Sequence, residues 1–397
     1  MASVSGLGTE SVPVDRAVGR VCAADVCARV DSPSVDASMK DGYAIIARDI
    51  HDADSARPVR LTVIEHVAAG DLSARRILSG SAARVLTGAP IPVGADAVLP
   101  DEFVDCDGRF ILARAPAGKG RNVLAQGTDV AEGEVLAGGG EALSPQRIGL
   151  LVAGGVCEVP VIRRPRIALL ATGNEVLLPG SQLERGKLYA SNVALQDAWF
   201  KAFGMSSRVS LAGDRADELA ESVSRLLAES DVLITSGGAW KGERDLIVTV
   251  LKSMGLELLF HRVRMGPGKA VAMGLINGKP VFCLPGGPTS NEMAFLKIAF
   301  PAILKMAGFR SSPLLYLDGV LERDITGQSD WTQFVQCLLI RGDTGLIFRP
   351  IKIKSRLASI ARTHALVRIP EGVARISAGR RVRGLVLDTS AIAPVIS

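Results

Sequence analysis

The sequence predicts a multidomain α/β protein in which a central three-layer domain, a parallel sheet between two layers of helices, is flanked by β-rich domains. Between residues 166 and 309, short apolar segments alternate with stretches that have helical periodicity. On both sides of this region the apolar segments are short and are separated by turn residues. The chain has 397 residues, which corresponds to about two to four domains.

The central region contains the elements of a covered sheet. One helical face of residues 216–228 carries Leu219, Val223, Leu226 and Leu227. Thr289–Glu292 has the spacing of a capping box, which predicts a helix that begins there. Strands that alternate with helices favour a parallel sheet covered on both faces. The expected strands are residues 167–171, 231–235, 258–263 and 281–284, and the expected helices are residues 191–203, 216–228, 246–254 and 289–306.

The flanking regions lack the regular alternation of strands and helices and consist mostly of short predicted strands and turns. We expect a helix over residues 14–30, short strands over 41–124, and a second helix after Ser144, where Pro145 suits a first helical position. After Gly308 the chain returns to β texture. These changes predict four domains: residues 1–40 with 125–165, a β-rich insert at 41–124, the α/β domain at 166–309, and a β-barrel-like domain at 310–397.

Composition excludes several classes of function. The net charge of +5 is too small and too evenly spread for a nucleic-acid partner. No apolar run is long enough to cross a membrane, and the N-terminus lacks the apolar core of a signal peptide. The six cysteines have no metal-site spacing, which is typical of reduced thiols. We therefore expect a cytoplasmic protein.

Three segments of the central region leave a strand and enter a polar, glycine-rich turn: residues 170–175, 234–245 and 284–290. The carboxyl ends of parallel strands meet at one rim, where ligands bind. Exposed backbone N–H groups in such turns suit a phosphate. The sequence therefore predicts an anion site at this rim.

Charged residues in and beside these turns fit the same site. Glu175, Asp231 and Asp245 could bind Mg²⁺ through carboxylate oxygens, although Asp245 or Glu243 could instead cap the next helix. Lys269 could offset a phosphate charge. Since no dinucleotide fingerprint, P-loop or Ser/Cys–His–acid pattern is present, carboxylates, lysine and backbone amides are the expected working groups.

Motifs spread over nearly the whole chain form one set: Ser38–Ala44 (SMKDGYA), Leu86–Pro92 (LTGAPIP) continued by Gly94–Val98 (GADAV), Gln126–Asp129 (QGTD), Ala171–Glu175 (ATGNE), Ala190–Asn192, Thr235–Gly238 with Gly242–Asp245, and Pro267–Lys269. With these motifs the chain resembles the MoeA molybdopterin molybdenumtransferase and gephyrin E-domain family. The first two segments and the SGG…GERD element are long and specific.

The resemblance implies an elongated four-part homodimer whose central domain is similar to MogA. The implied reaction inserts molybdate into the dithiolene of adenylylated molybdopterin, with Mg²⁺ assistance and release of AMP. It also implies a pterin substrate, and contact with a MogA-like adenylyltransferase and with molybdoenzyme maturation factors.

Site residues follow from the resemblance position by position. Asp41 and Thr87 would reach in from the second subunit, and Asp129 would assist from the hinge region. The central domain would contribute Glu175, Asp231, Asp245 and Lys269 to catalysis, the first three also as metal ligands. The expected cofactor-binding residues are Ser236, Gly237, Gly238, Pro285, Gly286, Ser355 and Asp129.

Two departures weaken the resemblance. Gly266 stands where the family has a lysine, and Gly287 where it has an asparagine. Trp240 and Lys241 replace small residues in the SGG loop, and Lys241 would restore part of the lost charge. One alternative is thus a non-catalytic molybdopterin-binding scaffold or cofactor-insertion paralogue. Another is a nucleotide hydrolase similar to the CinA family, which shares the α/β fold.

Overall fold

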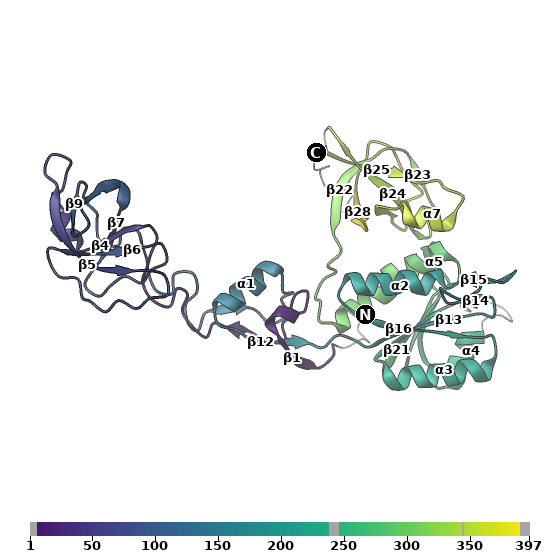
Figure 1. Cartoon of the computed structure of the whole chain (residues 1–397). Helices are drawn as coiled ribbons and strands as arrows, with labels where there is room; N and C mark the ends of the chain where they lie inside the picture. The colour runs from purple at the N-terminus through teal and green to yellow at the C-terminus, as the bar shows by residue number, and fades with distance from the viewer. Residues whose placement is uncertain (1–5, 238–245, 344, 390–397) are drawn as a thin grey trace. The chain divides into compact units, whose positions relative to one another are not determined.

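The computed structural model describes residues 6–237, 246–343 and 345–389, and its chain divides into two compact units. The N-terminal unit spans Glu10–Val161, and the C-terminal unit combines Met1–Thr9 with Ile162–Ser397. Figure 1 colours the chain from purple at the N-terminus to yellow at the C-terminus. In the part of the chain that the structure describes, no helix combines the length and the apolar character needed to cross a membrane.

The first module of the N-terminal unit is a six-stranded sheet with the order β7-β4-β6-β5-β9-β8. Tyr43 and Ile45 of β4 pack in one apolar cluster and Ala44 in another, because successive strand residues face opposite sides of a sheet. The strands are β4 (Gly42–Ile45), β5 (Val59–Val67), β6 (Ser81–Val85), β7 (Ala97–Pro100), β8 (Val104–Cys106) and β9 (Phe110–Ala113).

The second module of this unit joins two distant segments, residues 17–28 and 130–161, around one apolar cluster. It contains the expected helix α1 (Pro145–Ala153), where Ser144 Oγ accepts the capping bond from Arg147 N at 3.2 Å. Three two-stranded pairs, β1-β12, β2-β11 and β3-β10, lie in this module and in the segments that connect it to the six-stranded sheet. The strands are β1 (Thr9–Pro13), β2 (Val26–Cys27), β3 (Ala37–Ser38), β10 (Val123–Leu124), β11 (Val135–Ala137) and β12 (Glu158–Ile162).

The helix expected over residues 14–30 is wrong. A single 3₁₀ turn, Val14–Arg16, is followed by extended chain. Val21 and Cys22 form bridges with Ala142 and Val161, and β2 pairs with β11. Tertiary pairing with chain more than a hundred residues away overrides the local helical pattern.

The C-terminal unit begins with a six-stranded sheet of order β16-β13-β17-β21-β20-β18. Strands β16, β13, β17 and β21 are parallel, as expected from the alternation of strands and helices. The strands are β13 (Ile167–Thr172), β16 (Ser207–Ala212), β17 (Val232–Ser236), β18 (Glu257–His261), β20 (Ala272–Ile276) and β21 (Lys279–Leu284), with β14 (Val176–Leu177) and β15 (Leu188–Tyr189) as a separate pair.

Helices cover both faces of this sheet, which confirms the predicted three-layer domain (Figure 1). Ile167 and Leu169 of β13 pack with one helical layer, whereas Ala168 and Leu170 pack with the other. This double burial explains the continuous apolar run of the strand. The first layer holds α2 (Ser191–Ala202), α5 (Pro288–Ala294) and α6 (Phe300–Met306), and the second holds α3 (Ala216–Glu229) and α4 (Leu246–Ser253).

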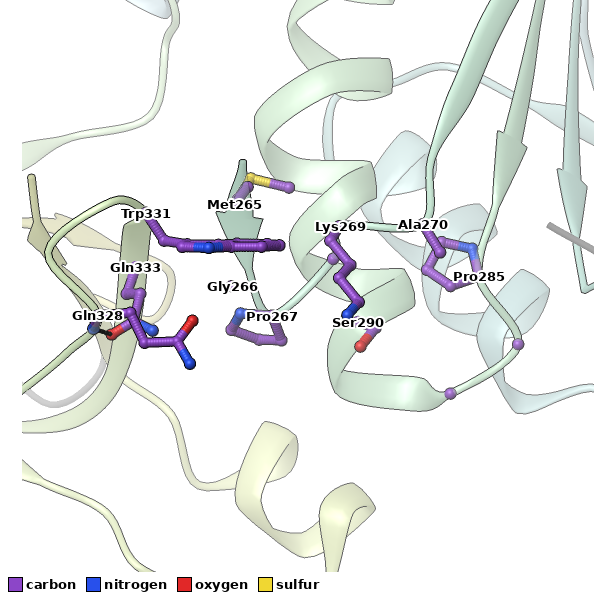
Figure 2. A pocket seen from close by; sticks show the side chains of 13 residues that line it. Met265, Gly266, Pro267, Lys269, Ala270, Pro285, Ser290, Gln328, Trp331 and Gln333 are labelled. Carbon is purple, nitrogen blue, oxygen red and sulfur yellow. Dashed lines mark hydrogen bonds between the residues drawn. The ribbon is translucent and has the colours of Figure 1, made fainter. Parts of the chain in front are cut away.

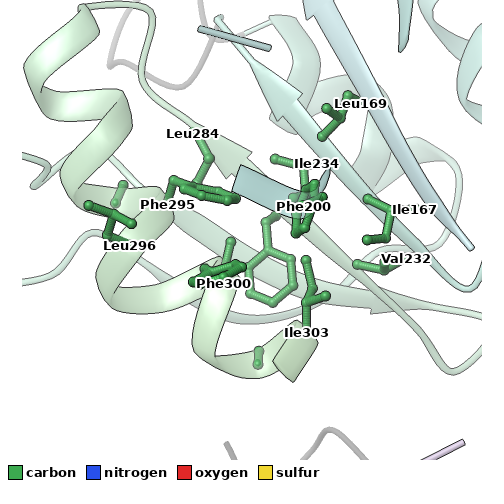
Figure 3. Packing of buried hydrophobic residues seen from close by; sticks show 14 of the residues in the cluster. Ile167, Leu169, Phe200, Val232, Ile234, Leu284, Phe295, Leu296, Phe300 and Ile303 are labelled. Atoms are coloured by element: carbon green, nitrogen blue, oxygen red, sulfur yellow. The ribbon is translucent and has the colours of Figure 1, made fainter. Parts of the chain in front are cut away.

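Aromatic rings join α2 to the helix that runs from residue 288 to 306 (Figure 3). The Phe200 ring lies 5.3 Å from that of Phe295 and 5.9 Å from that of Phe300, between ring centroids. The capping box expected at its start is not formed: Gly287 is the N-cap, with no side-chain capping bond, and Pro288 is the first helical residue.

The sheet is mixed at one edge, where β20 pairs antiparallel to both β21 and β18. Asn277 and Gly278 connect β20 to β21 with φ values of 50° and 74°. Two such residues form the tight turn that a two-residue hairpin requires.

The last part of the chain forms a barrel, because its strands pair in a closed ring: β24-β25-β22-β28-β26-β24. The short β19 (Met265–Gly266), from the α/β domain, adds to β24 in parallel register. The other elements are β22 (Tyr316–Leu321), β23 (Ile325–Thr326), β24 (Thr332–Gly342), β25 (Gly345–Pro350), α7 (Arg356–Ala361), β26 (Ala365–Ile369), β27 (Arg375–Ile376) and β28 (Arg381–Val386).

Candidate functional site

The turns that follow β13, β17 and β21 line one pocket of about 860 Å³. Glu175 comes from the first turn, Ser236 and Gly237 from the second, and Gly286 from the third. The facing wall is residues 354–357, at the start of α7. We name this space the serine pocket, after Ser236.

Two asparagines hold the hydroxyl of Ser236. Asn192 Nδ2 donates to Ser236 Oγ at 3.2 Å and to the Gly286 carbonyl at 2.9 Å. Asn291 Nδ2 donates to the same Oγ at 3.0 Å and to the Pro285 carbonyl at 2.7 Å. The carbonyl acceptors establish which amide atom is nitrogen in each asparagine. Since the two bonds use both lone pairs of Oγ, the O–H of Ser236 is left to donate, and it borders the serine pocket.

Glycine is required at position 237 by the backbone conformation and by the lack of space for a side chain, not by contact with a ligand. Its φ is 114°, and a Cβ there would lie 2.7 Å from Thr172 Oγ1. Its N–H donates to the Leu284 carbonyl at 3.1 Å, so it extends the pairing of β17 with β21. The expected cradle of backbone amides is therefore not formed at Gly237; Gly238 lies outside the described residues.

A second pocket, of about 650 Å³, shares Gly286 and Gly287 with the serine pocket. We name it the tryptophan pocket, after Trp331, which precedes β24. Lys269 Nζ lies 5.6 Å from the centre of the Trp331 ring, a cation–π distance. Figure 2 shows the side chains of Trp331, Lys269 and Gln328 around a common space. Among the described residues that line this pocket, Lys269 is the one cation.

Asp231 does not reach the rim, and the expectation that it shares the ligand site is wrong. It precedes β17, at the amino end of the strand. Its carboxylate accepts from Arg163 Nη1 and from the Arg166 backbone N–H, both at 2.8 Å. Burial alone would raise the pKa of Asp231, but the bonds from both arginines hold that pKa well below its usual range. Asp231 thus anchors the start of β13.

The described residues do not form the expected magnesium site. Glu175 lines the serine pocket, but Asp231 lies at the opposite end of the sheet and Asp245 is outside the described residues. Within residues 6–237, 246–343 and 345–389, no group of three or more His, Cys, Asp and Glu side chains is placed to hold a metal ion.

Asp214 is a rim carboxylate that sequence reasoning missed. It follows β16, a strand that the sequence analysis did not expect. Asp214 Oδ2 accepts from Asn174 N, and Asn174 Oδ1 accepts from Asp214 N, both at 3.1 Å. The position directly after a parallel strand is the signal that could have found it.

In the N-terminal unit the structure brings Asp41 and Thr87 together. The backbone N–H and the hydroxyl of Thr87 donate to Asp41 Oδ1 at 2.7 and 2.8 Å. These bonds hold the pKa of Asp41 below its ordinary value. Asp129 is exposed, and its backbone N–H donates to the Ser32 carbonyl at 2.9 Å. Trp240, Lys241 and Glu243 lie outside the described residues.

Family models match the chain in three consecutive parts. Residues 1–155 match the MoeA N-terminal region (domain I and II), residues 168–305 match a probable molybdopterin binding domain, and residues 318–387 match the MoeA C-terminal region (domain IV). The chain belongs to the MoeA family. A match over nearly its whole length favours this family over the nucleotide-hydrolase alternative.

Curated relatives and solved structures agree with this assignment to the MoeA family. Molybdopterin molybdenumtransferase 2 of Mycobacterium tuberculosis (strain ATCC 25618 / H37Rv) is 30% identical, with 94% of each chain covered. Molybdopterin molybdenumtransferase of Bacillus subtilis (strain 168) is 30% identical over 96% of this chain and 90% of its own. The crystal structure of a molybdopterin biosynthesis MoeA protein from Pyrococcus horikosii is 33% identical, has a TM-score of 0.83, and covers 97% of this chain and 95% of its own. The chain thus belongs to an enzyme family, as predicted, and the predicted fold class, a central α/β domain with flanking β-rich domains, is confirmed.

Proposed function

We propose that this MoeA-family chain inserts molybdate into adenylylated molybdopterin and releases AMP. The observation that best supports the proposal is the convergence of three post-strand turns on the serine pocket, which adjoins the tryptophan pocket at Gly286 and Gly287. One pocket offers a serine hydroxyl whose oxygen accepts from two asparagines, and the other offers a cation beside an aromatic ring. A substrate that has both phosphate groups and a heterocycle suits such a pair.

The chain's own groups act by binding and by charge stabilisation. The Ser236 O–H donates to a phosphate oxygen in the serine pocket, and the two asparagines hold it in that orientation. Lys269 offsets the negative charge that develops as the phosphoanhydride opens. Glu175, on the wall of the serine pocket, orients the pterin side of the substrate. Pro285, Gly286 and Ser355 shape the remaining walls.

The proposal is tested by AMP release. The purified chain is mixed with adenylylated molybdopterin, Mg²⁺ and molybdate, and AMP and molybdenum-loaded pterin are both measured. We expect AMP release that requires molybdate, and a drop of about 100-fold in Lys269→Met, the size of a lost charge donor. Release that does not depend on molybdate would instead indicate a hydrolase.

Magnesium is the proposed cofactor on the strength of the family resemblance alone. Glu175, which lines the serine pocket, and Asp245 are the proposed ligands, because Asp231 is paired with Arg163 and Arg166 at the other end of the sheet. Comparing AMP release with Mg²⁺ and with a chelator tests the cofactor, and Asp245→Asn tests the ligand that lies outside the described residues.

We further propose a homodimer in which Asp41 and Thr87, with Asp129, complete the partner's site. Co-expression of Asp41→Ala with Lys269→Met tests it, because a mixed dimer would keep one site with both residues intact. Recovery of about a quarter of the wild-type rate is expected from random pairing. No recovery would contradict a shared site. The cytoplasmic location, the four domain boundaries, and contacts with an adenylyltransferase and with maturation factors stay predictions.

A non-catalytic scaffold is the second candidate, and one observation favours it. Gly266 faces Gln333 of β24, so the tryptophan pocket lacks a second cation at that position. A Cβ at Gly266 would lie 3.6 Å from the Gln333 side chain, so a larger residue fits. Tight binding of adenylylated molybdopterin without AMP release would favour the scaffold, and activity gained by Gly266→Lys would locate the lost charge.

A further inference from the structure

We propose that Arg356 binds the phosphate of the substrate in the serine pocket, and that Gly287 is small because the Arg356 guanidinium occupies the space beside it. The inference rests on the proposed function and assigns a role to two residues that the family resemblance leaves without one. It concerns binding of a phosphate monoester anion such as AMP.

Arg356 reaches the serine pocket from the barrel. It is the first residue of α7, and with Lys354 and Leu357 it lines the wall that faces Ser236. Ser355 Oγ caps the helix by accepting from Ala358 N at 3.2 Å. The cap holds the start of α7 in place, so the arginine enters the pocket from a fixed backbone.

The far end of α7 is tied to the α/β domain. Ser359 donates its hydroxyl proton to Gln336 of β24, and Gln336 is also hydrogen-bonded to the buried Glu292 of α5. Helix α5 begins directly after Gly287. Gln336 therefore links α7, which carries Arg356, to α5, which follows Gly287.

Gly287 leaves room for the guanidinium. A Cβ built on Gly287 would lie 3.7 Å from Arg356 Nη1, which is an ordinary van der Waals contact. The φ and ψ of Gly287 are −69° and 127°, which any residue adopts. An alanine would fit, but the amide of an asparagine would extend into the space of the guanidinium. Where the family has a neutral amide, this chain therefore has a cation.

The charges of the serine pocket favour an anion at this position. Among the described residues that line this pocket, Arg356 and Lys354 are the cations and Glu175 is the one carboxylate. A phosphate that accepts from the Ser236 O–H lies in a pocket that already holds a negative charge, so it needs a cation. A guanidinium offers two parallel N–H donors to two phosphate oxygens.

The test measures binding of AMP and of adenosine to the full chain by titration calorimetry. We expect Arg356→Gln to weaken AMP binding at least tenfold and to leave adenosine binding within twofold, because adenosine has no phosphate. Arg356→Lys should recover part of the loss, since it keeps the charge without the fork. Arg362→Gln, at the C-terminal end of the same helix, is the matched control and should bind AMP like the wild type.

Gly287 supplies a second, independent arm. Gly287→Asn should weaken AMP binding about as much as Arg356→Gln, while Gly287→Ala should stay within twofold of the wild type. In a double-mutant cycle, Gly287→Asn should weaken AMP binding little further in the Arg356→Gln background, because the asparagine acts by displacing the Arg356 guanidinium. Full additivity would overturn the role of Gly287.

Two results would overturn the role of Arg356: undiminished AMP binding in Arg356→Gln, or no AMP binding by the wild type. The molybdenum-transfer assay separates this inference from the proposed function. If the wild type transfers molybdenum and Arg356→Gln binds AMP as tightly as the wild type, the inference alone is refuted. Loss of AMP binding in Arg356→Gln, with no transfer by the wild type, refutes the function alone.

Discussion

Glu292 predicts a pH-dependent weakness in the C-terminal unit. It lies in α5, is 3% exposed, and its Oε2 has no hydrogen-bond partner in the described structure. Burial raises the pKa of Glu292 from 4.5 to about 7, and the bond from Gln336 opposes the rise only in part. An acid with a raised pKa stabilises the fold while it is protonated, and this contribution is lost as the pH rises through the folded value.

The size of the effect follows from the shift. A rise of about 2.5 pKa units at about 1.4 kcal/mol each corresponds to about 3 kcal/mol of unfolding free energy at pH 8. Glutamine has the shape of the protonated acid and carries no titrating proton. We therefore expect Glu292→Gln to match the wild type within about 1 kcal/mol at pH 5 and to exceed it by about 3 kcal/mol at pH 8.

Urea unfolding followed by tryptophan fluorescence measures this difference. All three tryptophans, at positions 199, 240 and 331, belong to the C-terminal unit, so the signal reports that unit. Glu322→Gln is the control, because that half-buried carboxylate pairs with Arg349, which lowers the pKa of Glu322. Its difference from the wild type should not grow between pH 5 and pH 8. A constant difference between Glu292→Gln and the wild type over this range would refute the reasoning.

Three further predictions concern individual residues. Asp231→Asn should lose about 3 kcal/mol of stability, since two arginines lose the carboxylate that both pair with, and should leave kcat unchanged. A lower kcat in the transfer assay would return Asp231 to the mechanism. Gly237→Ala should lose about 2 kcal/mol in urea unfolding, because its Cβ would collide with Thr172 and φ is 114°; a neutral result would contradict the turn geometry. Asp41→Asn should abolish transfer and keep the far-ultraviolet circular dichroism spectrum, and retained transfer would remove Asp41 from the proposed shared site.

Much of the central domain was predictable from local pattern. The helical face of Leu219, Val223, Leu226 and Leu227 is buried as expected in α3, and β13 is an uninterrupted apolar strand. Such patterns are visible in the sequence because the positions that a helix or strand buries must be apolar, and they recur with the period of that element. The antiparallel edge was also within reach, since Asn277-Gly278 is a typical hairpin turn.

Other features depended on contacts between segments far apart in the chain. Val21 and Cys22 gain strand partners near residues 142 and 161, and these pairings override a helical pattern. Asp231 is the first residue of the strand expected at 231–235, so its place at the amino end was within reach of the sequence; its pairing with Arg163 and Arg166 needed the fold. Glu292 has the spacing of a cap, yet its side chain is buried and hydrogen-bonded to Gln336 of the barrel.

The sequence by itself determined the family, the α/β character of the central domain and the three turns that line the serine pocket, because each of these depends on contiguous residues. Only the tertiary structure decided which groups face that site. Two asparagines donate to the hydroxyl oxygen of Ser236, and the Gly237 N–H donates to the Leu284 carbonyl of the neighbouring strand. Arg356, from the barrel, lies beside Gly287. Hydrogen-bond direction and available volume are properties of segments brought together by folding, so no local pattern contains them.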